Sequence, residues 1–152
     1  MSDSAPATPS ARVRALKALY EAILRGDTAA VSAALADDIE WEHGTGADAV
    51  PWAMFRKGRE AVEAAMRVDT DTAFRFAPVT FFESGRRVTA LVEFVLHAAG
   101  AAGSPAPEPH TWREAHQWEF GDDGRIVRLR QRGERAATTR GGATLLAFGH
   151  RP

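Results

Sequence analysis

Hydrophobic positions in the first part of the chain recur at helical spacing. Residues 10 to 25 carry apolar side chains three and four positions apart, at Val13, Leu16, Tyr20, Ile23 and Leu24. Gly26 then stands where a helix often ends, and Asp27 can cap a second helix over "TAAVSAALA". Further along, "GREAVEAAMR" predicts a third helix with an inward face of Val62, Ala65 and Met66.

A period of two, which is typical of strands, runs through much of the remaining chain. "DDIEWEHG" puts Ile39, Trp41 and His43 on one face, and "GTGADAVPWAMF" after it has the composition of an irregular loop. "TAFRFAPVTFFES", interrupted at Pro78, and "RVTALVEFVLHA" predict two strands joined by a turn. "HTWREAHQWEFGDDGRIVRLRQ" predicts two more. Helices followed by an antiparallel meander indicate an α+β fold.

The last predicted hairpin carries polar groups on its apolar face. A four-residue turn is expected to place Phe120 opposite Arg125, which would pair Trp118 with Val127, His116 with Leu129, and Glu114 with Gln131. The inner face would then hold Trp112, Glu114, His116, Trp118, Val127, Leu129 and Gln131. The other face would carry Arg128, Arg130 and Arg132.

A carboxylate and an imidazole on an apolar face are expected either to bond to another polar group or to serve a function, because burying a polar group without a partner costs about 2–7 kcal/mol. Imidazole suits general acid and base work near neutral pH, so His43 and His116 are candidate catalytic groups, with Glu114 orienting His116. Two alternatives stay open. His116 can be a core histidine bonded to Glu114 or Gln131, and His43, His116 and Glu114 can form a two-histidine, one-carboxylate iron site.

Composition narrows the classes of function. The chain has 152 residues, 45% of them hydrophobic and 26% charged, and its net charge is −1, which disfavours a nucleic-acid partner. It contains no cysteine and no apolar run long enough to span a membrane. Residues 1–9 lack the features of a signal peptide and are expected to be a disordered leader, so a cytoplasmic location is the default. One domain over 10–135 and a loose tail over 136–152 are expected.

Three stretches together resemble the nuclear transport factor 2-like superfamily, especially its SnoaL-like and ketosteroid-isomerase-like members. These stretches are "LYEAILRGDTAAVSAALADDIEWE", "FRKGREAV" and "WEFGDDGRIVRLR". The resemblance implies a cone in which three helices pack against a strongly curved antiparallel sheet that encloses a pocket. It also implies a homodimer that works without a cofactor or metal.

The resemblance also assigns roles to individual residues. Ketosteroid isomerase's general-base aspartate falls on His43, its oxyanion-stabilising aspartic acid on His116, and its tyrosine on Leu19, with Tyr20 one residue out of register. A pair of pocket histidines is closer in kind to scytalone dehydratase, and limonene epoxide hydrolase has an aspartate where Gln131 stands.

These assignments predict proton-transfer chemistry, which means isomerisation, dehydration or aldol-type cyclisation, on a small, largely apolar carbonyl or hydroxyl compound. The substrate would lie among Trp41, Trp52, Phe55, Trp112, Trp118, Leu129 and Gln131. A module of the same fold that binds a small molecule, or acts as a scaffold, without catalysis is the alternative.

Overall fold

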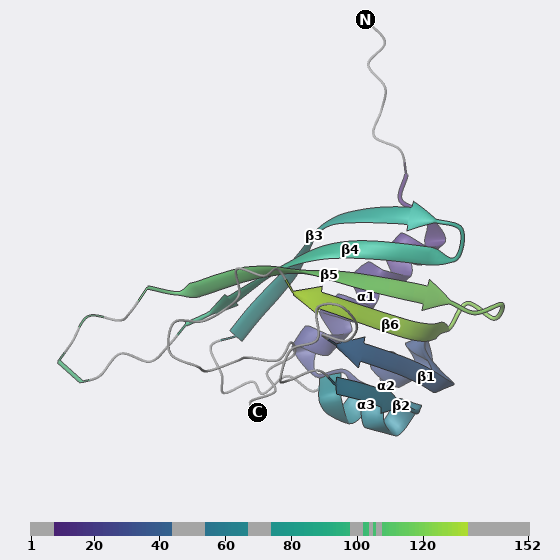
Figure 1. The fold of residues 1–152 in the computed structure, drawn as a ribbon, viewed down its shortest axis with the longest axis horizontal. Helices are drawn as coiled ribbons and strands as arrows, with labels where there is room; N and C mark the ends of the chain where they lie inside the picture. Colours follow the sequence, from purple (N-terminus) through teal and green to yellow (C-terminus); the bar gives the residue numbers. More distant parts are fainter. Residues whose placement is uncertain are drawn as a thin grey trace, which may run out of the picture.

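The computed structural model describes residues 8–43, 54–66, 74–97, 102–103, 105 and 108–133. Within these residues, three helices lie on one face of a six-stranded sheet whose strand order is β2-β1-β6-β5-β4-β3 (Figure 1). The α+β architecture predicted from the sequence is therefore confirmed. The described residues contain no helix of the length and apolarity that a membrane crossing requires.

The helices begin and end where the sequence signals stand. Helix α1 (Ala11–Arg25) is capped by Ser10, whose Oγ accepts a hydrogen bond from the Val13 amide, and it ends at Gly26 with φ at 71°. Asp27 caps α2 (Thr28–Ala34) by accepting from the Ala30 amide. Helix α2 is shorter than its alanine-rich pattern because Leu35 is extended and begins the first strand. Helix α3 (Arg59–Met66) follows the third predicted helix.

The sheet is mixed, which corrects the expectation of a purely antiparallel one. Strand β1 (Leu35–His43) lies parallel to β6 (Ile126–Gly133), whereas the chain from β3 (Phe74–Ser84) through β4 (Arg87–Leu96) and β5 (His110–Phe120) to β6 is an antiparallel meander. A short strand that the pattern missed, β2 (Met54–Lys57), pairs with β1 at the edge. It falls in part of the expected loop, of which residues 44–53 lie outside the described residues.

The β5–β6 register differs from the prediction by two residues. Trp118 pairs with Leu129 rather than Val127, and His116 pairs with Gln131 rather than Leu129. One residue of the shift arises at the turn, where Phe120 pairs with Ile126 rather than with Arg125. The other arises from a bulge between Phe120 and Glu119, which leaves Val127 half-buried instead of on the inner face. Because the shift is even, Leu129 and Gln131 keep the inward orientation that their pattern predicts.

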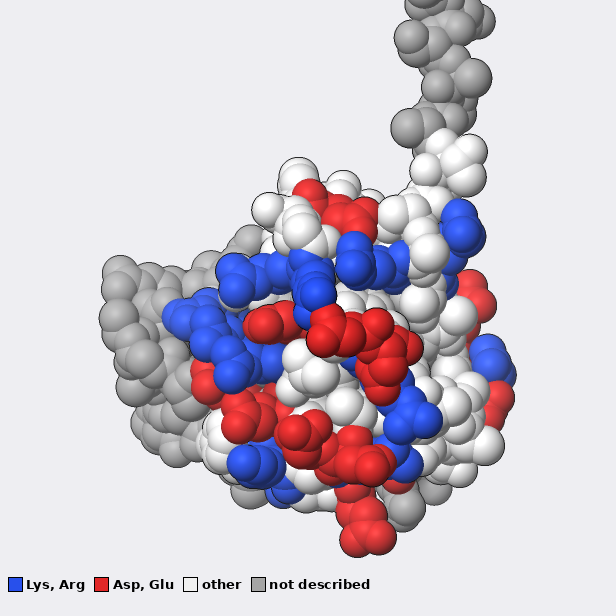
Figure 2. Space-filling model, turned by 90° about the vertical axis from the view of Figure 1, so that its right-hand side faces the viewer, with Lys and Arg blue, Asp and Glu red and all other residues white. Residues whose placement is uncertain are grey.

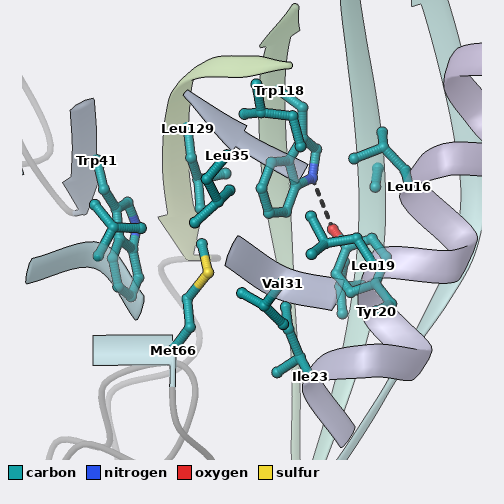
Figure 3. Packing of buried hydrophobic residues seen from close by; sticks show 14 of the residues in the cluster. Leu16, Leu19, Tyr20, Ile23, Val31, Leu35, Trp41, Met66, Trp118 and Leu129 are labelled. Atoms are coloured by element: carbon teal, nitrogen blue, oxygen red, sulfur yellow. Dashed lines mark hydrogen bonds between the residues drawn. The ribbon is translucent and has the colours of Figure 1, made fainter. Parts of the chain in front are cut away.

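The inner face of the sheet and the helices form one core. Trp41, Trp118 and Leu129 are fully buried there, together with Leu16 and Tyr20 of α1 (Figure 3). Alternate residues of the same strands face outward, where Glu40 pairs with Arg128 at 3.3 Å and Glu42 with Arg130 at 3.5 Å. The outward placement predicted for these arginines is confirmed. On the face shown in Figure 2, basic and acidic side chains are interleaved.

Candidate functional site

Three neighbouring strands bring the predicted polar residues together. The register aligns His43 of β1 with Gln131 of β6, and Gln131 with His116 of β5. Glu114 lies two residues before His116 on the same face. The exposed fractions of His43, Glu114, His116 and Gln131 are 3%, 4%, 0% and 1%, and these four are the buried polar residues among those described. The cluster lies at the sheet end where β1 and β6 finish and β5 begins, far from the β5–β6 turn (Figure 1).

Glu114 is the centre of the cluster. Its Oε1 accepts a hydrogen bond from Trp112 Nε1 at 3.1 Å, and its Oε2 accepts from Gln131 Nε2 at 2.5 Å and lies 3.2 Å from His116 Nε2. Burial alone would raise the pKa of Glu114, but the hydrogen bond and charge of His116, the charge of His43 and the Gln131 amide together lower the pKa below its ordinary value. The site therefore holds a buried, ionised carboxylate.

His116 is bonded through both ring nitrogens. Its Nε2 faces the Glu114 carboxylate and its Nδ1 lies 2.8 Å from the Tyr20 hydroxyl. Trp118 Nε1 donates to that same hydroxyl at 2.9 Å (Figure 3). Burial raises the pKa of Tyr20 far above its usual range, so its proton stays in place. The bonding is complete when Nε2–H donates to Glu114 and the Tyr20 O–H donates to Nδ1.

His43 differs from His116 because its Nδ1 has no hydrogen-bond partner among the described residues. Its Nε2 lies 4.0 Å from Glu114 Oε1, beyond hydrogen-bond length, and its Nδ1 is buried. Burial lowers the pKa of His43, the Glu114 carboxylate opposes that effect, and His116 adds to it, with a net decrease. His43 is therefore a neutral imidazole at neutral pH, placed beside a fixed negative charge.

The remaining predicted residues divide into those inside the cluster and those outside it. Trp41 donates its Nε1–H to Gln131 Oε1 at 3.0 Å. Trp118 and Leu129 are fully buried next to the polar side chains of the cluster. Phe55, expected to be a pocket wall, is instead 54% exposed, because it pairs with Glu42 and so shares the outer face of the sheet. Trp52 lies outside the described residues.

Tyr20 is the member of the cluster that sequence reasoning missed. The comparison with ketosteroid isomerase placed the relevant tyrosine on Leu19, yet it is Tyr20 that reaches His116. The signal was its helical spacing from Leu16, which puts Tyr20 on the buried stripe of α1. A tyrosine on such a stripe needs a partner for its hydroxyl, and that requirement points to a polar group across the interface.

The arrangement does not have the form of a metal centre. Among the described residues, no group of three or more histidine, aspartate or glutamate side chains is placed to hold a metal ion. The imidazoles of His43 and His116 both turn toward Glu114 rather than toward a shared point. The residues present therefore do not fit the two-histidine, one-carboxylate iron site that their types allowed.

A separate open groove of about 740 Å³ lies between α1 and β3. Tyr20 lines it, together with apolar side chains that include Val13, Leu24, Phe76 and Phe81. His43, Glu114 and His116 do not line it, so Tyr20 is the member of the polar cluster that the groove reaches.

Comparison with known proteins identifies the architecture. The model of the SnoaL-like domain family matches residues 16–129. A nuclear transport factor 2-like protein of unknown function from Burkholderia pseudomallei K96243 shares 30% identity over 84% of this chain and 94% of its own, with a TM-score of 0.64. No curated protein matches.

Two more distant solved structures share the fold. TerC co-crystallised with polyporic acid is 23% identical over 84% of this chain and 95% of its own, with a TM-score of 0.62. An epoxide hydrolase of M. tuberculosis that resembles limonene epoxide hydrolase is 21% identical over 81% and 82%, with a TM-score of 0.60. The fold is thus found in an enzyme as well as in proteins of unknown function.

Proposed function

We propose that this chain, which belongs to the SnoaL-like domain family, is an enzyme for proton transfer on a small, largely apolar carbonyl or hydroxyl compound, with His43 as its base. Isomerisation, dehydration and aldol-type cyclisation are the reactions that such a base serves. The observation that carries the proposal is the pairing of Glu114 with only one side of the His43 ring, while Nδ1 has no partner in the part of the chain that the structure describes.

In this proposal, Glu114 determines which nitrogen of His43 acts as the base. The negative charge near Nε2 favours the proton on that nitrogen and leaves the lone pair on Nδ1. When Nδ1 accepts a proton from the substrate, the imidazolium faces the carboxylate at 4.0 Å, an attraction of about 4 kcal/mol at an effective dielectric constant of about 20. The lowered pKa of His43 keeps the free base ready at neutral pH.

The other residues hold this pair in place. His116, Gln131 and Trp112 anchor the carboxylate, so Glu114 cannot turn away from His43. Since both nitrogens of His116 are bonded, we propose that His116 positions Glu114 instead of protonating the substrate, which revises the role that the sequence suggested. Trp41 and Trp112 would provide apolar walls for a substrate held beside His43.

The second candidate is a binding or scaffolding module of the same fold. It is favoured by the completeness of the bonding around Glu114 and His116, since a satisfied buried network is also what a purely structural cluster needs. In that case, His43 would be a core side chain and its protonation would not be linked to any reaction.

Turnover separates the two candidates. The purified protein is assayed against β-hydroxy ketones, β,γ-unsaturated ketones and diketones able to close by aldol addition, each followed by ultraviolet absorbance. His43→Ala should fold normally and lose about 10²–10⁴-fold in turnover, the usual contribution of a general base. The matched control His97→Ala removes an exposed histidine directly after β4 and should keep full activity. Wild-type turnover in His43→Ala would favour the binding module.

A further inference from the structure

Most of the hydrogen-bond donors around His43 already have acceptors. Trp41 donates to Gln131, and Gln131 and Trp112 donate to Glu114. Trp118 donates to Tyr20, and the Tyr20 hydroxyl and His116 complete the chain to Glu114. Among the described residues of the cluster, these bonds leave the second N–H of the Gln131 amide as the one donor for a negative oxygen at a distance from the base. Enolisation next to a carbonyl requires such a donor, because the charge moves from carbon to the carbonyl oxygen.

His43 itself offers an acceptor. The tautomer with its proton on Nε2 directs an N–H toward the Glu114 carboxylate at 4.0 Å and leaves a lone pair on Nδ1. The opposite tautomer would direct a lone pair at a carboxylate oxygen and bury an Nδ1–H group without an acceptor. Electrostatics therefore favours the first tautomer, and a ligand that completes the bonding of Nδ1 must bring a donor.

We infer that the site takes its substrate through a hydroxyl group, an alcohol, phenol or enol, that donates to His43 Nδ1, rather than through a carbonyl oxygen. This inference rests on the proposed function and narrows its substrate class. In the reaction step, the substrate O–H bond breaks, an N–H bond forms at Nδ1, and the electron pair stays on the oxygen. The alkoxide or phenolate then remains hydrogen-bonded to the new Nδ1–H, so the base stabilises the charge that it creates.

The tautomer of His43 is measurable without a ligand. Nitrogen-15 NMR of the full chain, with the ring signals assigned by their loss in His43→Asn, should show Nδ1 unprotonated and Nε2 protonated at neutral pH. The His97→Ala variant serves as the assignment control. Protonation of Nδ1 would overturn the inference, yet it would leave the turnover test of His43→Ala standing. Unchanged turnover in His43→Ala would instead sink the proposed function, whatever the tautomer.

A matched set of probes tests the hydroxyl preference. Calorimetry compares 2-naphthol with 2-methoxynaphthalene, which lacks the donor, and with 2-acetylnaphthalene, which presents a carbonyl acceptor. Naphthol should bind about tenfold more tightly than either, the effect of one buried hydrogen bond. His43→Asn should remove most of this preference, because its amide both donates and accepts. Tighter binding of the ketone, or no binding of any probe, would overturn the inference. Equal binding of naphthol and its ether, as expected if water fills the position, would overturn it as well.

Discussion

Removing one hydroxyl group from the cluster tests whether Tyr20 holds the network together. Tyr20→Phe keeps the ring and its packing, including the edge contact with Trp118 at 5.7 Å and the stacking on His116 at 5.9 Å. The change leaves no cavity larger than the lost oxygen. It removes only the acceptor of Trp118 Nε1 and the donor to His116 Nδ1.

The expected cost follows from those two atoms. Both partners are fully buried, and a buried polar group left without its partner costs about 1–3 kcal/mol, so the free energy of unfolding should fall by about 2–6 kcal/mol. That is a large part of the roughly 5–15 kcal/mol that stabilises a typical domain. Urea denaturation of the wild type and the variant at neutral pH measures the difference.

The control removes a hydroxyl from the exposed face of the same sheet. Thr111→Val on β5 keeps the branched shape and should change the free energy of unfolding by less than about 0.5 kcal/mol. If Tyr20→Phe is as mild as this control, the tyrosine does not satisfy Trp118 and His116, and the hydrogen bond from its hydroxyl to His116 Nδ1 loses its support.

Three further predictions concern charge. Because the pKa of His43 is lowered in the folded state, the free energy of unfolding measured by urea denaturation should decrease as pH falls below about 6.5. The lowered pKa of Glu114 adds a second decrease as pH falls below 4.5. A free energy of unfolding that stays constant between pH 7 and 4 would contradict both. Glu114→Gln should cost about 1–3 kcal/mol of stability, because the Gln131 amide would face a second amide, and should abolish the turnover supported by His43; full turnover would show that His43 works without the carboxylate. Arg130→Ala, which breaks a half-exposed outer pair with Glu42, should cost less than about 1 kcal/mol in the same denaturation assay, and a loss of several kcal/mol would mean that the pair supports the sheet far more than its exposure suggests.

Alternation along single strands could be read from the sequence, and so could the inward side of each strand. His43 with Trp41, and Glu114 with His116, fall on the buried face because neighbouring positions on each strand are apolar there. The alternation does not predict which strands pair with one another, or in which direction. The parallel pairing of β1 with β6 joins segments about ninety residues apart, and no local signal specifies such a contact.

The bulge and the helix contact were also beyond a local reading. The turn and the bulge beside Phe120 each moved the register by one residue, so His116 meets Gln131 instead of Leu129. Tyr20 approaches His116 from α1, and its role depends on how that helix lies on the sheet. The inward placement of the polar strand residues was therefore predictable, whereas the contribution of Tyr20 and the bonds between these residues depend on tertiary geometry.

The tertiary geometry also explains how a carboxylate can sit on an apolar sheet face. Each of Trp41, Trp112 and Trp118 donates its indole N–H to Gln131, Glu114 or Tyr20. An indole brings a donor, no acceptor and a large apolar surface, so it can satisfy an anion without admitting water or adding a lone pair that needs a partner itself. Alternating tryptophans that would otherwise be read only as core are thus hydrogen-bond donors to the polar network, Trp112 to Glu114 itself and Trp41 and Trp118 to its neighbours. In the proposed function, Glu114, held in this network, determines which nitrogen of His43 acts as the base.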